Sequence, residues 1–151
     1  MDTTIVNHID PNDINPDDIE IRLMTLEDYE EVHALWMTIR GFGIRALDDS
    51  REDIQRFIRR NPTTSVVARM DGRIVGSILC GSDGRQGALY HVCVARDYRR
   101  RGIAKELLRR VVEEARAYGC GAVQITASDM GVLLYTDFGF VKNGNFMQYK
   151  L

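Results

Sequence analysis

The chain has 151 residues, of which 44% are hydrophobic and 28% charged, a composition that indicates one folded domain and excludes a disordered chain. Its 20 Lys and Arg against 22 Asp and Glu give a net charge of -2. That balance supplies no overall attraction for nucleic acid or an anionic membrane, so we expect neither as a partner. A domain of this length buries roughly two-thirds of its unfolded surface, so no metal is needed to hold it together.

Three cysteines, Cys80, Cys93 and Cys120, lie among apolar neighbours without close pairing. An odd number in this setting predicts buried free thiols rather than disulfides, which fits a reducing compartment. The N-terminus lacks the basic start and apolar run of a signal peptide, and no segment approaches the roughly 18 apolar residues of a membrane span. We therefore expect a cytoplasmic protein.

Residues 1–18 show no hydrophobic periodicity and contain two prolines, so they are predicted to be an N-terminal extension of a domain over residues 19–151. Residues 19–23 alternate apolar and polar side chains, which indicates a strand. Thr25 resembles the start of a capping box, and apolar side chains then recur at helical spacing through residue 39. Ser50 provides a second cap for a helix that ends at Asn61-Pro62.

The middle of the chain predicts an antiparallel pair and then a third strand. Residues 64–70 and 74–80 are rich in β-branched side chains and are joined through Asp71-Gly72, a strong hairpin signal. Residues 88–94 are a third apolar segment of this kind and predict the third strand. The apolar positions after Ile103 then lie on one face of a helix that ends at Gly119.

The last part predicts a strand over 122–126, a helix over about 130–138 and a closing hairpin. The hairpin would pair residues 140–141 with 146–150 around an Asn143-Gly144 turn. The predicted order is β-α-α-β-β-β-α-β-α-β-β, a mixed α/β (α+β) layout without internal repeats.

The most informative segment is the basic turn Arg99-Arg100-Arg101-Gly102-Ile103-Ala104, between a predicted strand and a predicted helix. The first N–H groups of a helix lack intrahelical partners and carry the positive end of the dipole, so they suit a pyrophosphate. Gly102 permits close approach of an anion to the backbone. The arginines can add charge-assisted contacts.

Together with Val92-Cys93-Val94 before it, this turn resembles the acetyl-CoA signature of the GNAT superfamily of N-acetyltransferases. The family pattern is Arg/Gln-x-x-Gly-x-Gly/Ala after a strand, and Arg99, Gly102 and Ala104 match it. The resemblance implies the GNAT fold, with a mostly antiparallel central sheet, and implies that the N–H groups of residues 100–104 hold the CoA pyrophosphate. It also implies that the backbone of residues 92–94 holds the acetyl group and pantetheine, with an N–H near Val94 facing the oxyanion.

Two other interpretations of charged and glycine-rich segments remain open. The three arginines could form a solvated turn or a weak nucleic-acid patch. The segment 41–46 fits the dinucleotide pattern G-x-G-x-x-A, but it follows a predicted helix rather than a strand, so the Rossmann setting is missing. We interpret it as a loop near the acceptor or a plain helix stop.

Tyr135 precedes a Gly-Phe pair, which is similar to the second hallmark of the family and implies that its phenol donates a proton to the CoA sulfur. A phenol stays protonated at neutral pH because its reference pKa is about 10. The alternative is a half-buried core tyrosine. The family often has Asn and Ala where this chain has Ser128 and Gly131, and Ser128 would hydrogen-bond pantetheine.

His91 is the candidate general base, with a structural histidine as the alternative. Strict alternation puts His91 and Cys93 on one face of the strand, and Tyr90, Val92 and Val94 on the other, unless a bulge resets the phase. Asp48 and Asp49 either attract a cationic amine or simply lead into the helix capped by Ser50.

These patterns predict an enzyme that transfers the acetyl group of acetyl-CoA to a primary amine of a small molecule or peptide, by direct attack in a ternary complex. The alternative is a non-catalytic acyl-CoA-binding or regulatory module. Cysteine catalysis is not expected, because no histidine is predicted to pair with a thiolate. The resemblance also implies a possible homodimer.

Overall fold

The structure is a computed structural model that describes residues 18–39, 49–145, 147–149 and 151. A five-stranded sheet runs through its centre in the order β1-β2-β3-β4-β5. The strands are β1 (Glu20–Leu23), β2 (Val66–Met70), β3 (Arg73–Ser82), β4 (Gln86–Val94) and β5 (Ala122–Gln124). The helices are α1 (Tyr29–Met37), α2 (Arg51–Arg60), α3 (Ile103–Tyr118) and α4 (Val132–Phe138).

Neighbouring strands pair antiparallel from β1 to β4, and β4 pairs parallel with β5. The predicted β2–β3 hairpin is confirmed: Asp71 and Gly72 make the turn with φ of 53° and 75°, the left-handed region that a tight hairpin requires. The predicted order is therefore confirmed from β1 through α4. The mixed sheet flanked by helices is the α/β class expected from the sequence.

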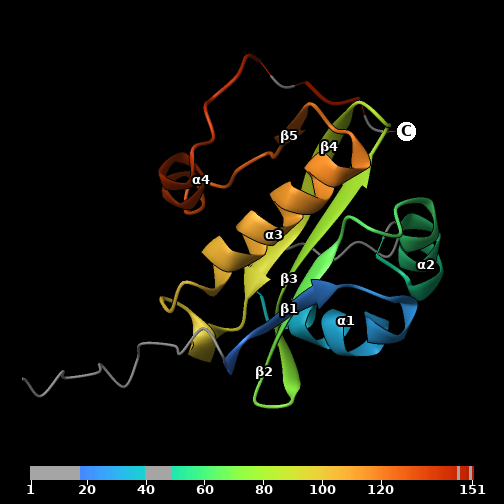
Figure 1. Cartoon of the computed structure of the whole chain (residues 1–151), viewed down its shortest axis with the longest axis vertical. Helices are drawn as coiled ribbons and strands as arrows, with labels where there is room; N and C mark the ends of the chain where they lie inside the picture. The colour runs from blue at the N-terminus through green and yellow to red at the C-terminus, as the bar shows by residue number, and fades with distance from the viewer. Residues whose placement is uncertain (1–17, 40–48, 146, 150) are drawn as a thin grey trace, which may run out of the picture.

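Two hydrophobic clusters cover opposite faces of the sheet. Helix α3 packs through its apolar stripe on one face, where Leu107, Leu108 and Val111 are fully buried. Helices α1 and α2 pack on the other face, around the fully buried Trp36. Figure 1 shows α3 lying along the sheet, with α4 off to one side of it. The sheet is thus a buried central layer, and functional groups must emerge at its ends or edges.

The helix starts predicted at Thr25 and Ser50 are confirmed, with one refinement. The Ser50 side chain accepts a hydrogen bond from the Asp53 N–H at 3.2 Å, as a helix cap does. After Thr25 the chain first forms a 3-10 helix over Leu26–Asp28 and only then α1. The Thr25 N–H donates to the Asp28 carboxylate at 2.8 Å, which is the hydrogen bond from the cap residue to the acidic side chain of the predicted capping box.

Strand β4 contains a β-bulge close to its C-terminal end. Ser77 pairs with Cys93 and Leu79 with Tyr90, so a single residue of β3 faces two residues of β4, His91 and Val92. His91 has a φ of 51°, a left-handed conformation that is uncommon for a residue other than glycine. The bulge therefore resets the side-chain alternation along the last part of the strand.

Beyond the bulge, β4 and β5 no longer pair. The parallel register joins Gln86–Ala88 to Ala122–Gln124, and β5 ends there, two residues earlier than predicted. The C-terminal end of β4 therefore has a ladder partner on the β3 side only, among the described residues. The two strands open toward the turn that leads into α3.

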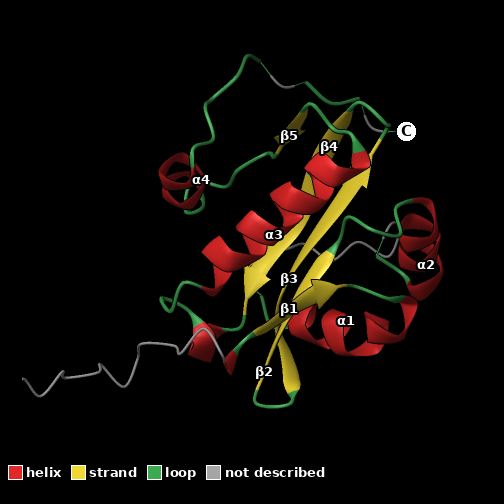
Figure 2. Cartoon of the chain, viewed as in Figure 1, coloured by secondary structure: helices red, strands yellow, loops and turns green. Residues whose placement is uncertain are grey.

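The predicted closing hairpin is wrong for the described residues. After α4, residues 139–145 and 147–149 contain no strand, and Figure 2 draws this part as loop. Large apolar side chains of this segment are exposed: Val141 is 86% exposed, Met147 87% and Tyr149 89%. Because β5 is only three residues long, it offers too short a ladder for this segment to extend. Helix α4 also begins later than predicted, at Val132.

The described residues contain neither a helix long and apolar enough to cross a bilayer nor a group of three metal-ligating side chains. Residues 1–17 and most of the 41–49 loop lie outside the described residues. The expectations for the N-terminal extension, for Asp48 and for the glycines of that loop therefore stay predictions.

Candidate active site

The basic turn connects the open end of β4 to α3 through a 3-10 helix over Arg96–Tyr98. Gly102 is the N-cap of α3 with a φ of 82°, which favours glycine, and no side chain caps this helix end. A Cβ built on Gly102 meets no atom within 4 Å, so the space over this residue is open. The α3 N-terminus thus presents backbone N–H groups and the positive end of a 16-residue helix to that space.

The arginines of the turn have different environments. Arg99 Nε donates to the carbonyl oxygen of Val94 at 3.0 Å and ties the turn to the end of β4. The Arg101 guanidinium lies 5.3 Å from the centre of the Tyr98 ring, a cation-π distance. Arg100 is exposed and has a φ of 62°. Ile103 is 1% exposed, so it offers only its backbone to a ligand.

Backbone groups at the end of β4 face two different sides. The Ala95 N–H donates to the Val75 carbonyl of β3 at 2.7 Å. Since successive residues of a strand direct their N–H and C=O groups to opposite sides, Val94 directs its own toward the β5 side. Its carbonyl there accepts the Arg99 bond. The Val94 N–H is consequently a donor beside the gap between β4 and β5.

Tyr135 of α4 packs into the α3-side core cluster that also contains Val94, and it is 8% exposed. Its ring stacks edge-on with Phe140 at 5.5 Å between centroids. Burial raises the pKa of Tyr135 to about 12, and the nearby Cys93 thiol adds to this shift. The fold therefore brings this phenol to the end of β4 and keeps it protonated at neutral pH.

The small residues before Tyr135 have a steric role. The Gly131 N–H donates to the Ser128 hydroxyl at 3.2 Å, and a Cβ on Gly131 would lie 2.9 Å from Tyr135 Cε2 and 3.3 Å from Ser128 Oγ. Glycine at position 131 therefore fits between Ser128 and Tyr135, where the alanine that is frequent in the family would crowd the Tyr135 ring. Ser128 is exposed on the approach to α4, and its hydroxyl is available to a ligand that passes this point.

His91 lies on the α1 side of the sheet, and the bulge places it there. Tyr90 contacts Phe57 of α2, and the His91 ring meets Trp36 of α1 edge-on at 4.4 Å between centroids. Tyr90 and His91 thus lie on the same face of the sheet, although they are consecutive. Strict alternation predicted the face of His91 correctly and the face of Tyr90 wrongly. The His91 side chain is 20% exposed. Val92 and Val94 belong to the opposite face, with α3.

The bulge is held by a buried hydrogen-bond chain. Trp36 Nε1 donates to Ser77 Oγ at 3.0 Å, and the Ser77 hydroxyl donates to the His91 carbonyl oxygen at 3.0 Å. Trp36 and Ser77 are both 0% exposed. Ser77 Oγ also lies 3.5 Å from Cys93 Sγ. Sequence reasoning missed Trp36 and Ser77 as supports of the site, because the bulge that aligns them leaves no local sequence signal.

Replacing Ser77 by Ala should lower both stability and turnover. The change leaves the buried Trp36 N–H and His91 carbonyl without their partner, at a cost of about 1–3 kcal/mol in the free energy of unfolding. Ser65→Ala is the matched control, since Ser65, the residue before β2, is also buried and its hydroxyl accepts from the Cys80 N–H. Urea unfolding and kcat measurements should show similar stability losses for both variants, but a lower kcat for Ser77→Ala alone. Equal kcat values for the two variants would show that the bulge has no part in catalysis.

The three cysteines are free thiols, as predicted, although Cys120 is only partly buried. Burial raises the pKa of Cys80 and of Cys93 to about 11. Cys93 lies near the end of β4, but a thiol with this pKa is overwhelmingly protonated at neutral pH. A protonated thiol is a weak nucleophile.

These thiols predict a loss of stability at alkaline pH. Their pKa in the folded chain is raised from 9.0 to about 11, so the stability is fully present below about pH 9 and falls as the pH rises toward 11. Cys93→Ala removes one of the two contributions and should flatten this pH dependence. Urea titrations between about pH 8 and pH 10.5 measure it. The same slope in both proteins would show that the Cys93 thiol does not titrate as proposed.

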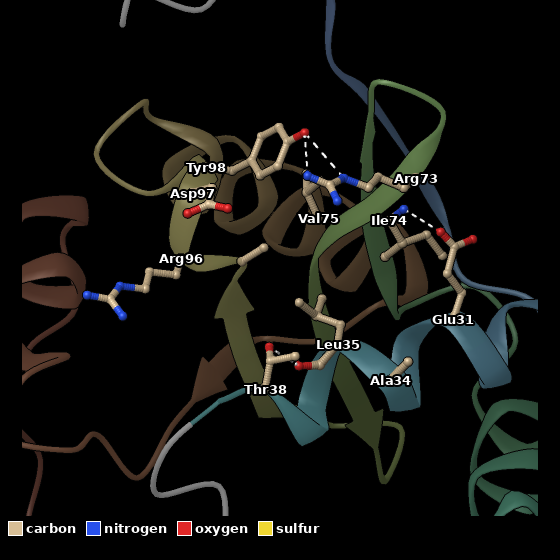
Figure 3. Close-up of a pocket in the computed structure, with 11 residues that line it drawn as sticks. Glu31, Ala34, Leu35, Thr38, Arg73, Ile74, Val75, Arg96, Asp97 and Tyr98 are labelled. Atoms are coloured by element: carbon tan, nitrogen blue, oxygen red, sulfur yellow. Dashed lines mark hydrogen bonds between the residues drawn. The ribbon is translucent and has the colours of Figure 1, made fainter.

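A cavity of about 360 Å³ lies elsewhere, between α1 and the first residues of β3. Figure 3 shows hydrogen bonds of two charged side chains that line it: the Ile74 N–H donates to Glu31 at 2.6 Å, and Arg73 donates to the Tyr98 hydroxyl at 2.9 Å. None of the residues predicted for catalysis or cofactor binding lines it. The hydrogen bonds around this cavity join β3 to α1 and to the residue just before the basic turn.

Taken together, the described geometry consists of an uncapped helix N-terminus, an open strand end and a buried phenol that converge at one end of the sheet. This arrangement is the one that the sequence predicted for an acyl-CoA-dependent transferase. The "Acetyltransferase (GNAT) domain" family model matches residues 25–149. "Acetyltransferase SG1711" from Sodalis glossinidius (strain morsitans) is 39% identical over 107 residues, which cover 71% of this chain and 74% of that protein. The chain belongs to the GNAT acetyltransferase family, and it is an acetyl-CoA-dependent acyltransferase.

Solved structures agree on the fold. A crystal structure from Pyrococcus horikoshii is similar with a TM-score of 0.70 and 24% identity; the match covers 87% of this chain and 46% of that one, so the chain spans less than half of it. The structure of AAC(6')-Iy in complex with the bisubstrate analog CoA-S-monomethyl-acetylneamine has a TM-score of 0.70 and 20% identity, with 88% of this chain and 97% of that chain covered.

Proposed function

We propose that this acetyltransferase transfers the acetyl group of acetyl-CoA to a primary amine of a small molecule or peptide by direct attack within a ternary complex. The observation that carries the proposal is the convergence of the α3 N-terminus, the Val94 N–H and the Tyr135 phenol around the open end of β4. A bisubstrate analog, which joins CoA to an acceptor, is bound by the structural neighbour AAC(6')-Iy and supports the ternary complex.

The cofactor is held mainly by backbone groups. The N–H groups of Arg100 through Ala104 bind the pyrophosphate, aided by the open space over Gly102 and by the helix dipole. The backbone of Val92 through Val94 holds the pantetheine and acetyl group, and the Ser128 hydroxyl adds one contact to pantetheine. The proposal assigns no role to a metal ion.

The proposed transfer has three chemical events. The amine nitrogen attacks the thioester carbonyl carbon, and the Val94 N–H stabilises the oxyanion as the N–C bond forms. The C–S bond then breaks, and the Tyr135 phenol donates a proton to the departing CoA sulfur. His91 takes the proton that the acceptor nitrogen loses. Exchange with solvent returns both side chains to their starting states.

The decisive experiment incubates the purified chain with acetyl-CoA and a panel of primary amines and peptides, and follows free CoA and acetylated product by mass spectrometry. Initial rates with both substrates varied should give intersecting double-reciprocal lines, as a ternary complex requires. Parallel lines would indicate a covalent intermediate and contradict direct attack. CoA binding without transfer to any amine would instead support a non-catalytic acyl-CoA-binding module.

The proposal includes a homodimer and a cytoplasmic location. Apolar side chains near the C-terminal end are exposed, including Met130 at 93% and Leu133 at 73%, and self-association would cover them. Light scattering on the purified chain should give twice the mass of one chain, and a monomer at all concentrations would remove the dimer from the proposal. The three free thiols suit a reducing compartment.

A further inference from the structure

The hydroxyl of Tyr98 joins the start of the basic turn to the β2–β3 hairpin. Tyr98 is the last residue of the 3-10 helix before Arg99, and it is 6% exposed. Its hydroxyl donates to Asp71 Oδ2 at 2.9 Å, and it accepts from Arg73 Nη2 at 2.9 Å and Arg73 Nε at 3.3 Å. Figure 3 shows the two hydrogen bonds from Arg73. A hydroxyl offers one donor and two acceptor positions, so residues 25 and 27 positions earlier in the chain use all of them.

The ring of Tyr98 holds two guanidinium groups. Arg73 Cζ lies 5.0 Å and Arg101 Cζ 5.3 Å from the ring centre, and both are cation-π distances. The Arg101 side chain therefore reaches back to a residue that precedes the turn. Since Arg73 belongs to β3, the same ring also links the turn to the sheet.

The basic turn needs such support because its backbone is unfavourable by itself. Arg100 has a φ of 62° and Gly102 a φ of 82°, so two of its residues are left-handed. A left-handed conformation at a residue other than glycine persists only where the surrounding structure enforces it. The bond from Arg99 to the Val94 carbonyl oxygen fixes the turn to β4, and Tyr98 fixes it to the hairpin. Backbone donors that are held in place before a ligand arrives lose less entropy when it binds.

We infer that Tyr98 is a positioning residue for CoA binding, which holds the basic turn in the conformation that directs the N–H groups of residues 100–104 at the pyrophosphate. The inference rests on the proposed function, in which these N–H groups bind the cofactor. Tyr98 acts through the turn and not by touching CoA, because its hydroxyl and ring are engaged with Asp71, Arg73 and Arg101. It also changes the role expected for Arg101, whose guanidinium braces the turn.

The test measures the dissociation constant for CoA by isothermal titration in Tyr98→Phe, Asp71→Gly and the double variant. Tyr98→Phe keeps the ring and loses the hydroxyl, and Asp71→Gly removes the carboxylate at a φ of 53°, which glycine adopts readily. Asp71 and Arg73 are exposed, so water solvates them after either change and the variants should fold. Each change should raise the dissociation constant about threefold to tenfold. The double variant should bind no more weakly than Tyr98→Phe, because both changes break the same link.

Tyr29→Phe is the matched control for the loss of a buried tyrosine hydroxyl. Tyr29 is also 6% exposed, and its hydroxyl donates at 2.9 Å to the Asp49 carbonyl oxygen, but it belongs to the cluster under α1 and α2. It should lose stability in urea and keep the CoA affinity of the unaltered chain. With an amine that the unaltered chain acetylates, Tyr98→Phe should raise the KM for acetyl-CoA and change kcat by less than about twofold, since the reacting groups stay in place.

An unchanged dissociation constant in Tyr98→Phe would overturn the inference while leaving the proposed function intact. Losses that multiply in the double variant would contradict it too, since Asp71 and Tyr98 would then act separately. Equal losses of affinity in Tyr98→Phe and Tyr29→Phe would show a general loosening of the fold, and Tyr98 would have no particular role. An unaltered chain that binds no CoA would instead contradict the proposed function.

Discussion

Gly102→Asp should raise the dissociation constant for CoA by about a hundredfold or more. Gly102 is the left-handed N-cap of α3, and the site over it is open. An Asp side chain there puts bulk and negative charge where the pyrophosphate would bind, and it supplies the carboxylate cap that this helix end lacks. Isothermal titration with CoA measures the effect directly.

Two controls separate charge from backbone strain. Gly102→Asn has nearly the same shape, and Asn tolerates the left-handed region, so its loss of affinity should be much smaller. Gly119→Asp changes the left-handed glycine at the other end of α3, with a φ of 104°, and should leave CoA affinity unchanged. Affinity retained in Gly102→Asp would remove the α3 N-terminus from the cofactor site.

Tyr135→Phe should lower kcat about a hundredfold and change the affinity for CoA by less than about twofold. The variant keeps the packing against Phe140 and loses only the phenol proton donor. Because burial raises the pKa of Tyr135 to about 12, the phenol stays protonated across the whole assay range. The rate ratio between the unaltered chain and the variant should therefore be constant from neutral pH to about pH 10.

Tyr118→Phe is the matched control, since Tyr118 lies at the exposed C-terminal end of α3. It should leave kcat unchanged. If Tyr135→Phe also kept the full rate, water or another group would be the proton donor, and Tyr135 would be a core residue only. A rate ratio that fell toward one near pH 9 would mean that the phenol ionises much earlier than its burial implies.

Most of the fold followed from local patterns. The Asp71-Gly72 hairpin, the Ser50 cap and the apolar stripe of α3 each combine a backbone preference with a burial pattern, so local and tertiary forces agree. The closing hairpin around Asn143-Gly144 had a turn signal but no partner, because strand pairing depends on an edge elsewhere in the sheet. The short β5 does not provide that edge.

The residues of the site also divide into those that the sequence predicts and those that it does not. The turn from Arg99 to Ala104 and the position of Tyr135 carry a sequence signature, because a tight helix entry and a proton donor need particular residues at fixed spacing. Trp36 and Ser77 carry none. Their importance comes from the bulge in β4 and from contacts across 41 and 14 positions, which are properties of the folded chain. A main-chain donor such as the Val94 N–H has no side-chain signal at all.

A crystal structure of the chain with acetyl-CoA tests the central claim most directly. We predict the pyrophosphate on the N–H groups of residues 100–104, the thioester carbonyl at the Val94 N–H, and the sulfur within hydrogen-bonding distance of the Tyr135 hydroxyl. Acetyl-CoA bound in the cavity between α1 and β3, or bound with its sulfur away from the end of β4, would contradict the account.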